Sequence, residues 1–189
     1  MGWATGAAFV CLIACVIVRA AMLRRRGVRV LVFGQTNKSD FILVPCVLAL
    51  VYCVVAPGFG WPMWGPLVAP FWPSAIPGWF GVALCWLAVI GLAYSLKSFG
   101  ESFRVGIDEH EPGGLITTGA FAVSRNPVYV CFIAFVAGIF LVEHNAITLI
   151  ALVVVPTVIH RQIVREESFL SAHYGPAFAA YCQTVRRYV

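Results

Sequence analysis

Residues 114–130 are Gly114-Leu-Ile-Thr-Thr-Gly-Ala-Phe-Ala-Val-Ser-Arg-Asn-Pro-Val-Tyr-Val130, a polar segment that leads directly into an apolar one. Asn126 precedes a proline and the residues after Pro127 are apolar, so we expect Asn126 to be an N-cap and Pro127 the first residue of a helix. A helix start presents free N–H groups and partial positive charge. With Arg125 beside it, this helix start is predicted to bind a carboxylate or a phosphate.

The composition around this segment is that of a membrane protein. Hydrophobic residues make up 61% of the chain, charged residues 11%, and the mean hydropathy is +0.89. A soluble domain would carry about 25% charged residues. A chain of 189 residues has room for about five spans of ~20 residues each. We therefore expect an all-α polytopic integral membrane protein that forms a single domain over residues 1–189.

The apolar segments predict about five transmembrane helices, at about residues 3–20, 41–56, 78–96, 127–142 and 146–160. The fifth helix is expected to leave the membrane and continue through Leu170. Gly175 would end it as a left-handed C-cap, and Pro176 would open a last helix. We expect that C-terminal helix to extend to Tyr188 and to lie at the cytoplasmic face of the membrane.

The basic residues predict the orientation. All thirteen fall on the same side of the five predicted spans, so the positive-inside rule places the N-terminus outside and the C-terminus in the cytoplasm, across the inner membrane if the source is bacterial. The uncharged loop 56–77 contains Trp61, Trp64 and Trp72 and should lie at the outer interface; a partly buried re-entrant connection is the alternative. Because the basic residues are juxtamembrane, topology and anionic lipid explain the net charge of +5 better than nucleic acid does.

Two other groups of residues invite functional interpretations that we do not adopt. Six of the seven cysteines lie within predicted spans and none forms a C-x-x-C pair, so we interpret them as small packing residues. The consecutive acidic and histidine side chains at Asp108, Glu109, His110 and Glu111 lack a second ligand cluster. No metal site is therefore predicted.

Glu166 and Glu167 are adjacent on the predicted extension of the fifth helix. Neighbouring residues on a helix point about 100° apart, so only one of the two can face a given pocket. The other interpretation is a solvated acidic pair bound to Arg161 or Arg165, and the spacing alone does not decide between them.

Several short motifs follow one another in the second half of the chain: Leu115-Ile116-Thr117-Thr118-Gly119-Ala120-Phe121, Ser124-Arg125-Asn126-Pro127-Val128-Tyr129, Arg165-Glu166-Glu167, Tyr174-Gly175, Tyr181 and Val185-Arg186-Arg187. Their order and spacing resemble the isoprenylcysteine carboxyl methyltransferase family and its bacterial relatives. The resemblance covers the chain from Phe99 to the C-terminus. One departure is Arg-Asn-Pro-x-Tyr, with Asn126 where the eukaryotic enzymes have histidine, and this weakens the inference that a prenylated protein is the substrate.

The resemblance implies a membrane enzyme that uses S-adenosylmethionine, with the cofactor entering from the cytoplasm and a lipophilic acceptor from the bilayer. It places the cofactor region at residues 99–129 and 161–189. It implies that Arg125, Asn126 and Tyr129 hold the cofactor carboxylate and that one of the two glutamates holds the ammonium group. The predicted cofactor-binding residues are Leu115, Ile116, Gly119, Arg125, Asn126, Tyr129, Glu167, Tyr174 and Tyr181, and the predicted catalytic residues are Glu166, Glu167 and Arg165.

The acceptor stays open at this point. A carboxylate, such as that of an isoprenylcysteine-like compound, is already ionised at neutral pH, whereas an amine or thiol would need a base such as His173 or the second glutamate. Arg165 or Arg187 could orient an anionic acceptor. Two alternatives to a methyltransferase remain: an NADPH-dependent reductase related to the sterol reductases, and a non-catalytic membrane scaffold. The oligomeric state is not predicted.

Overall fold

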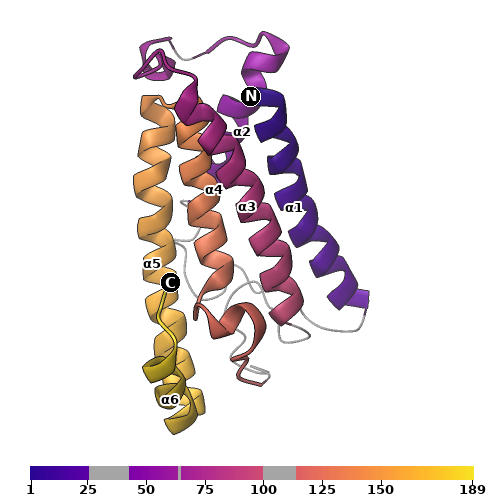
Figure 1. Ribbon diagram of the computed structural model, residues 1–189, viewed down its shortest axis with the longest axis vertical. Helices are drawn as coiled ribbons and strands as arrows, with labels where there is room; N and C mark the ends of the chain where they lie inside the picture. The colour runs from indigo at the N-terminus through magenta and orange to yellow at the C-terminus, as the bar shows by residue number, and fades with distance from the viewer. Residues whose placement is uncertain (26–42, 64, 100–113) are drawn as a thin grey trace.

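The computed structural model describes residues 1–25, 43–63, 65–99 and 114–189. These residues form α-helices and two short 3-10 helices and contain no strand, which confirms the all-α prediction (Figure 1). The α-helices are α1 (Gly2–Arg25), α2 (Leu43–Phe59), α3 (Ile76–Phe99), α4 (Pro127–Glu143), α5 (Ala146–Tyr174) and α6 (Pro176–Thr184), and the 3-10 helices are η2 (Gly65–Val68) and η4 (Gly119–Ala122).

The first five α-helices carry the predicted spans. α1, α3 and α5 are each long and apolar enough to cross a membrane. α2 and α4 are apolar helices of 17 residues, about 25 Å long at 1.5 Å per residue, slightly short of a ~30 Å hydrocarbon core. Residues 41 and 42 of the predicted second span lie outside the described residues. Every other residue of the predicted spans falls inside one of these helices.

Small residues bring α3 and α4 close together. A Cβ atom added at Gly81 would lie 2.5 Å from the carbonyl oxygen of Gly138, and one added at Gly138 would lie 2.6 Å from Cys85 Sγ. Such small residues let two helix backbones approach closely where lipid supplies no hydrophobic drive for association. Cys85 is fully buried in this contact and its thiol donates to the Phe135 carbonyl at 3.6 Å.

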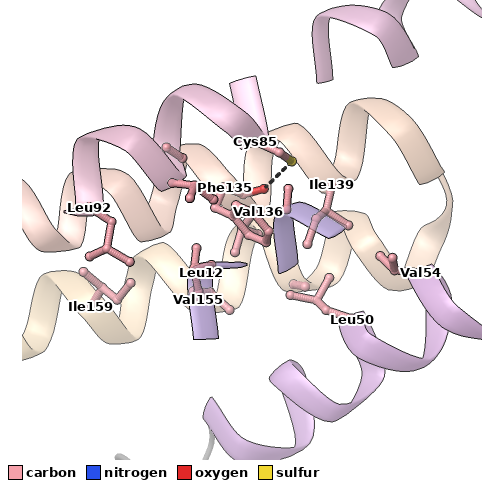
Figure 2. Close-up of a cluster of buried hydrophobic side chains, with 14 of the residues drawn as sticks. Leu12, Leu50, Val54, Cys85, Leu92, Phe135, Val136, Ile139, Val155 and Ile159 are labelled. Atoms are coloured by element: carbon pink, nitrogen blue, oxygen red, sulfur yellow. Dashed lines mark hydrogen bonds between the residues drawn. The ribbon is translucent and has the colours of Figure 1, made fainter. Parts of the chain in front are cut away.

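The apolar core continues along the bundle and contains side chains from each of the helices α1 to α5. Figure 2 shows side chains of α1, α2, α3, α4 and α5 meeting between the helices. All seven cysteines are free thiols, as the packing interpretation requires. The labelled core residues include Leu12, Leu50, Leu92, Ile139, Val155 and Ile159.

The tryptophan-rich loop and the α4–α5 turn form one end of the molecule, together with the N-terminus (Figure 1). The Phe71 N–H donates to the His144 carbonyl at 2.9 Å, and His144 Nε2 lies 2.7 Å from the Trp72 carbonyl oxygen. Asn145 caps α5, because its side-chain oxygen accepts from the backbone N–H groups of Ile147 and Thr148 at 3.0 and 3.1 Å. A tight turn thus joins the last two of the predicted spans.

The opposite end contains η4, the extension of α5, and α6. Gly175 ends α5 with φ of 52° and ψ of −123°: φ is positive, as predicted, but ψ lies outside the left-handed helical region. Pro176 is the first residue of α6, as predicted. The prediction that this last helix reaches Tyr188 is wrong, because α6 ends at Thr184 and Val185 is extended.

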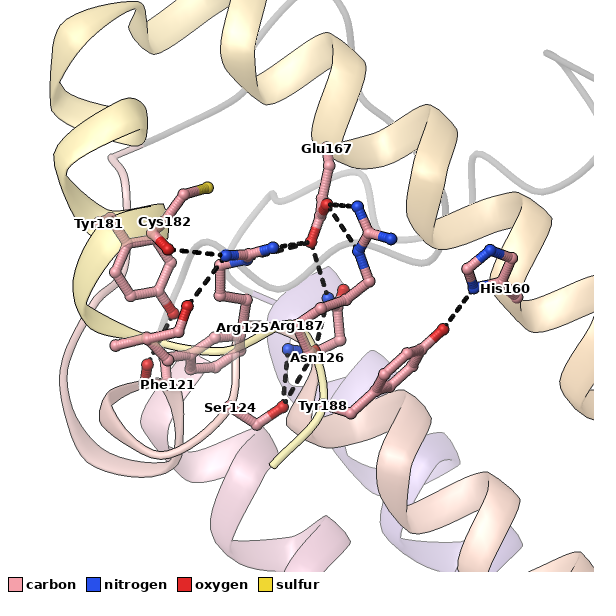
Figure 3. A network of polar contacts seen from close by, with 11 residues as sticks. Phe121, Ser124, Arg125, Asn126, His160, Glu167, Tyr181, Cys182, Arg187 and Tyr188 are labelled. Atoms are coloured by element: carbon pink, nitrogen blue, oxygen red, sulfur yellow. Dashed lines mark hydrogen bonds and ion pairs between the residues drawn. The ribbon is translucent and has the colours of Figure 1, made fainter.

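The physical reason lies in the partners of the C-terminal residues. The carbonyl oxygens of Cys182, Val185, Arg186 and Arg187 accept hydrogen bonds from the Ser124–Asn126 segment, 57 to 63 residues earlier in the chain. The C-terminal tail, residues 185–189, therefore runs back along α5. There the Tyr188 hydroxyl lies 2.6 Å from His160 Nδ1 (Figure 3).

Candidate functional site

η4 is fixed beneath the end of α3 by a glycine in a left-handed conformation. Gly119 has φ of +64°, and a Cβ there would clash with the Ser98 side chain. The Ser98 hydroxyl oxygen accepts from the Ala120 N–H at 3.1 Å, and Phe99 packs edge-on against Phe121 with ring centroids 4.8 Å apart. Gly119 was predicted to bind the cofactor. In the structure, its position at the start of η4 requires glycine because η4 packs against the end of α3.

Glu167 is the centre of a polar cluster that joins α5, the start of α4 and the C-terminal tail (Figure 3). Its Oε1 atom accepts from Arg125 Nε at 3.1 Å and lies 3.1 Å from the same guanidinium's terminal nitrogen Nη2. Its Oε2 atom accepts from Arg187 Nε at 2.9 Å, and Arg187 Nη2 is 2.8 Å away. One carboxylate is therefore held between two guanidinium groups.

The two arginines are held differently. Arg125 Nη1 also donates to the carbonyl oxygens of Cys182 and Val185, at 3.2 and 2.9 Å. The side chains of Arg125 and Glu167 are each 11% exposed, whereas that of Arg187 is 39% exposed. Arg125 is thus a nearly buried member of the cluster and Arg187 a partly exposed one.

Asn126 is the N-cap of α4 and Pro127 its first residue, as the sequence predicted. Its side chain, however, makes no capping hydrogen bond. The amide nitrogen Nδ2 donates instead to Glu167 Oε1 at 3.3 Å and to the Arg187 carbonyl at 3.1 Å. The amide therefore serves the contact between α5 and the tail, and the neighbouring backbone N–H of Arg125 donates to the Arg186 carbonyl at 2.9 Å.

This environment keeps Glu167 ionised. Burial raises its pKa, but the hydrogen bond from Arg187 and the charge of Arg125 outweigh burial and leave the pKa below its ordinary value. Glu167 therefore carries a full negative charge at neutral pH, and the hydrogen bond to Glu167 raises the pKa of Arg187.

Glu166 lies in a second polar contact. Its Oε1 atom accepts from the Tyr129 hydroxyl at 2.6 Å and from Gln162 Nε2 at 3.1 Å. The two adjacent glutamates thus meet different partners, as helix geometry predicted. Tyr129, predicted beside Arg125 at the cofactor carboxylate, hydrogen-bonds to Glu166.

The remaining predicted residues surround these two contacts. The Tyr181 hydroxyl donates to the Phe121 carbonyl at 2.6 Å, which ties α6 to η4, and burial raises the Tyr181 pKa to about 12. Tyr174, Arg165, Leu115 and Ile116 are half-buried and are not among the hydrogen-bond partners of Glu167. Residues 100–113 of the predicted cofactor region, including the acidic group at 108–111, lie outside the described residues.

Sequence analysis did not identify several residues of the site. Arg187 was considered only as an acceptor-orienting group, although an Arg-Arg pair at 186–187 is an obvious charge complement to the Glu-Glu pair at 166–167. Gln162 could have been found from its spacing, since residues four apart on a helix are neighbours. The contact between His160 and Tyr188 had no signal in the sequence.

The fold and the cluster together define a helical membrane protein with a charged site at one end of the bundle. Residues 76–177 match the family model described as phospholipid methyltransferase. This match covers more than half of the chain, so the chain belongs to that family, which includes the isoprenylcysteine carboxyl methyltransferases. Comparison with curated proteins and with solved structures gave no match. Family and apolar helices together identify a membrane methyltransferase.

Proposed function

We propose that the protein transfers a methyl group from S-adenosylmethionine to a lipophilic acceptor that enters from the bilayer. The observation that carries the proposal is the Glu167 cluster. It joins Glu167 and Arg125, both inside the segment that matches the methyltransferase family, at one end of an otherwise apolar bundle. Removing charged side chains from water costs free energy even when they are paired, and ionisable groups held in this way cluster at functional sites. The family match also favours methyl transfer over the NADPH-dependent reduction that the sequence left open.

The donor set suits the amino-acid end of this cofactor. That end carries an ammonium group and a carboxylate, and the cluster offers one ionised carboxylate, the guanidinium of Arg125 and the amide of Asn126. In this proposal Glu167 holds the ammonium and the Arg125 guanidinium holds the carboxylate, while the Asn126 amide keeps Glu167 and the tail in position. When bound, the cofactor would supply an electrophilic methyl group on its sulfonium.

The protein's own work in such a transfer is to align the two partners and to exclude water. Tyr181, tied to η4 through Phe121, would wall the adenine together with Leu115 and Ile116. Tyr174 would close the same side from the end of α5. Glu166, which accepts a hydrogen bond from the Tyr129 hydroxyl, would face the acceptor and could accept a proton if the acceptor is an amine.

The proposed orientation places this site in the cytoplasm. The basic residues at the ends of α1 and α3, Arg24, Arg25 and Lys97, lie at the same end of the bundle as α6 (Figure 1). Basic residues gather on the cytoplasmic side of membrane proteins. A cofactor dissolved in the cytoplasm would then reach the cluster directly.

Calorimetric titration of the detergent-purified protein with S-adenosylmethionine, and separately with NADPH, tests the proposal. We expect saturable binding of the first ligand alone. Glu167→Gln should weaken that binding at least tenfold, because the neutral amide cannot pair with an ammonium. Arg161→Gln is the matched control, since Arg161 is an exposed residue of the same helix, and it should bind like wild type. Absence of S-adenosylmethionine binding would refute the reaction class, and undiminished binding by Glu167→Gln would refute the site.

A further inference from the structure

The hydrogen-bonding capacity of Glu167 is already filled. Its Oε1 atom meets Arg125 and Asn126, and its Oε2 atom meets two nitrogens of Arg187. An ionised carboxylate has about four acceptor sites on its two oxygens. A ligand ammonium group can therefore reach Glu167 only if one of the groups now bound to it leaves.

Arg187 is the group that can leave at the lowest cost. Arg125 is 11% exposed and its guanidinium is also bound to two carbonyl oxygens. The Arg187 side chain is 39% exposed, and within the described part of the chain its guanidinium hydrogen-bonds to Glu167 alone. Leaving Glu167 would return the Arg187 guanidinium to water, where charged groups are well solvated.

The main chain at this position can stay in place while the side chain moves. The Arg187 carbonyl accepts from Asn126 Nδ2 at 3.1 Å and from the Ser124 hydroxyl at 3.4 Å. The next residue is held through the contact between Tyr188 and His160. Rotation of the Arg187 side chain alone would therefore free Oε2 of Glu167 without releasing the tail.

We infer that the Arg187 guanidinium competes with the cofactor's ammonium group for Glu167. Arg187 binds Glu167 in the empty enzyme and is displaced when the cofactor binds. The inference rests on the proposed function, because it takes Glu167 as the ammonium site. One cation replaces another on the same carboxylate, so Glu167 stays paired in both states. The competition lowers affinity only for ligands that carry the ammonium group.

The test compares wild type with Arg187→Gln and with Arg186→Gln, which removes an equal charge from the adjacent, exposed residue. Each protein is titrated with S-adenosylmethionine and with a deaminated analogue, which is S-adenosylhomocysteine without its α-amino group. We expect Arg187→Gln to bind S-adenosylmethionine more tightly, by up to about fivefold, the upper limit for a partly exposed ion pair. Arg186→Gln should bind like wild type, and all three proteins should bind the deaminated analogue alike.

A purely structural role for Arg187 predicts a different pattern. Loss of the pair with Glu167 should lower the melting temperature of the empty protein in either case. A structural role would weaken cofactor binding as well, whereas competition strengthens it. Equal or weaker binding of S-adenosylmethionine by Arg187→Gln overturns the inference while leaving the proposed function intact. Absence of binding by wild type overturns the proposed function, and the inference with it.

Discussion

The two ion pairs of Glu167 should differ in strength, and a double-mutant cycle can measure the difference. The side chains of Arg125 and Glu167 are each only 11% exposed, and Arg125 Nε donates to Oε1 at 3.1 Å. A hydrogen bond to a charged group contributes about 1.5–3 kcal/mol. Arg187 is 39% exposed, so water and salt screen its pair and we expect about 0.2–1 kcal/mol.

The cycle uses Glu167→Gln, Arg125→Gln and Arg187→Gln, singly and in the two pairs that include Glu167. Thermal unfolding in one detergent gives the melting temperature of each variant, and 1 kcal/mol corresponds to about 2–4 °C for a protein of this size. We expect a coupling of about 2 kcal/mol for Arg125 with Glu167, and less than half of that for Arg187. Equal couplings, or a coupling below about 0.5 kcal/mol for Arg125, would refute the distinction between the nearly buried and the partly exposed guanidinium.

Three further predictions follow from other features. The lowered pKa of Glu167 contributes stability that is complete above the unfolded-state pKa of about 4.3 and is lost as the pH falls through the lower pKa of the folded state. The difference in melting temperature between wild type and Glu167→Gln should therefore vanish at low pH. A difference that persists at low pH would contradict this assignment. Gly138→Ala should destabilise the protein by about 1–3 kcal/mol, because the added Cβ would lie 2.6 Å from Cys85 Sγ, while Gly2→Ala, where nothing lies within 4 Å, should melt like wild type. Tyr181→Phe should cost about 1 kcal/mol in unfolding experiments, since it removes the buried hydroxyl that binds the η4 main chain, and an unchanged melting temperature would show that this bond does not hold α6.

The parts of the structure that depend on local sequence were predictable. Asn126-Pro127 begins α4 and Pro176 begins α6 because a proline without an N–H is tolerated at the first helical position. The long apolar segments also predicted the positions of the helices, because the length of an apolar segment is a property of the local sequence.

The parts that depend on distant partners were not predictable. α6 ends at Thr184 because carbonyl oxygens of the tail bind a segment some sixty residues earlier, a pairing that helical periodicity cannot reveal. Similarly, Arg125 is 42 residues from Glu167 and Arg187 is 20 residues from it. The sequence predicted Arg125 and Glu167 as cofactor-binding residues, and only the fold shows that they bind each other.

α5 is a single helix of 29 residues, about 44 Å long, that runs from the cap at Asn145 to Tyr174. Glu167 lies about 10 Å along its axis beyond residue 160, where the apolar part ends. The tilt of α5 therefore sets the height of the charged cluster above the bilayer, and tilt responds to hydrocarbon thickness. Lipid chain length thus becomes a physical variable of this site: thinner bilayers tilt α5 more and change the distance between the cluster and the lipid headgroups.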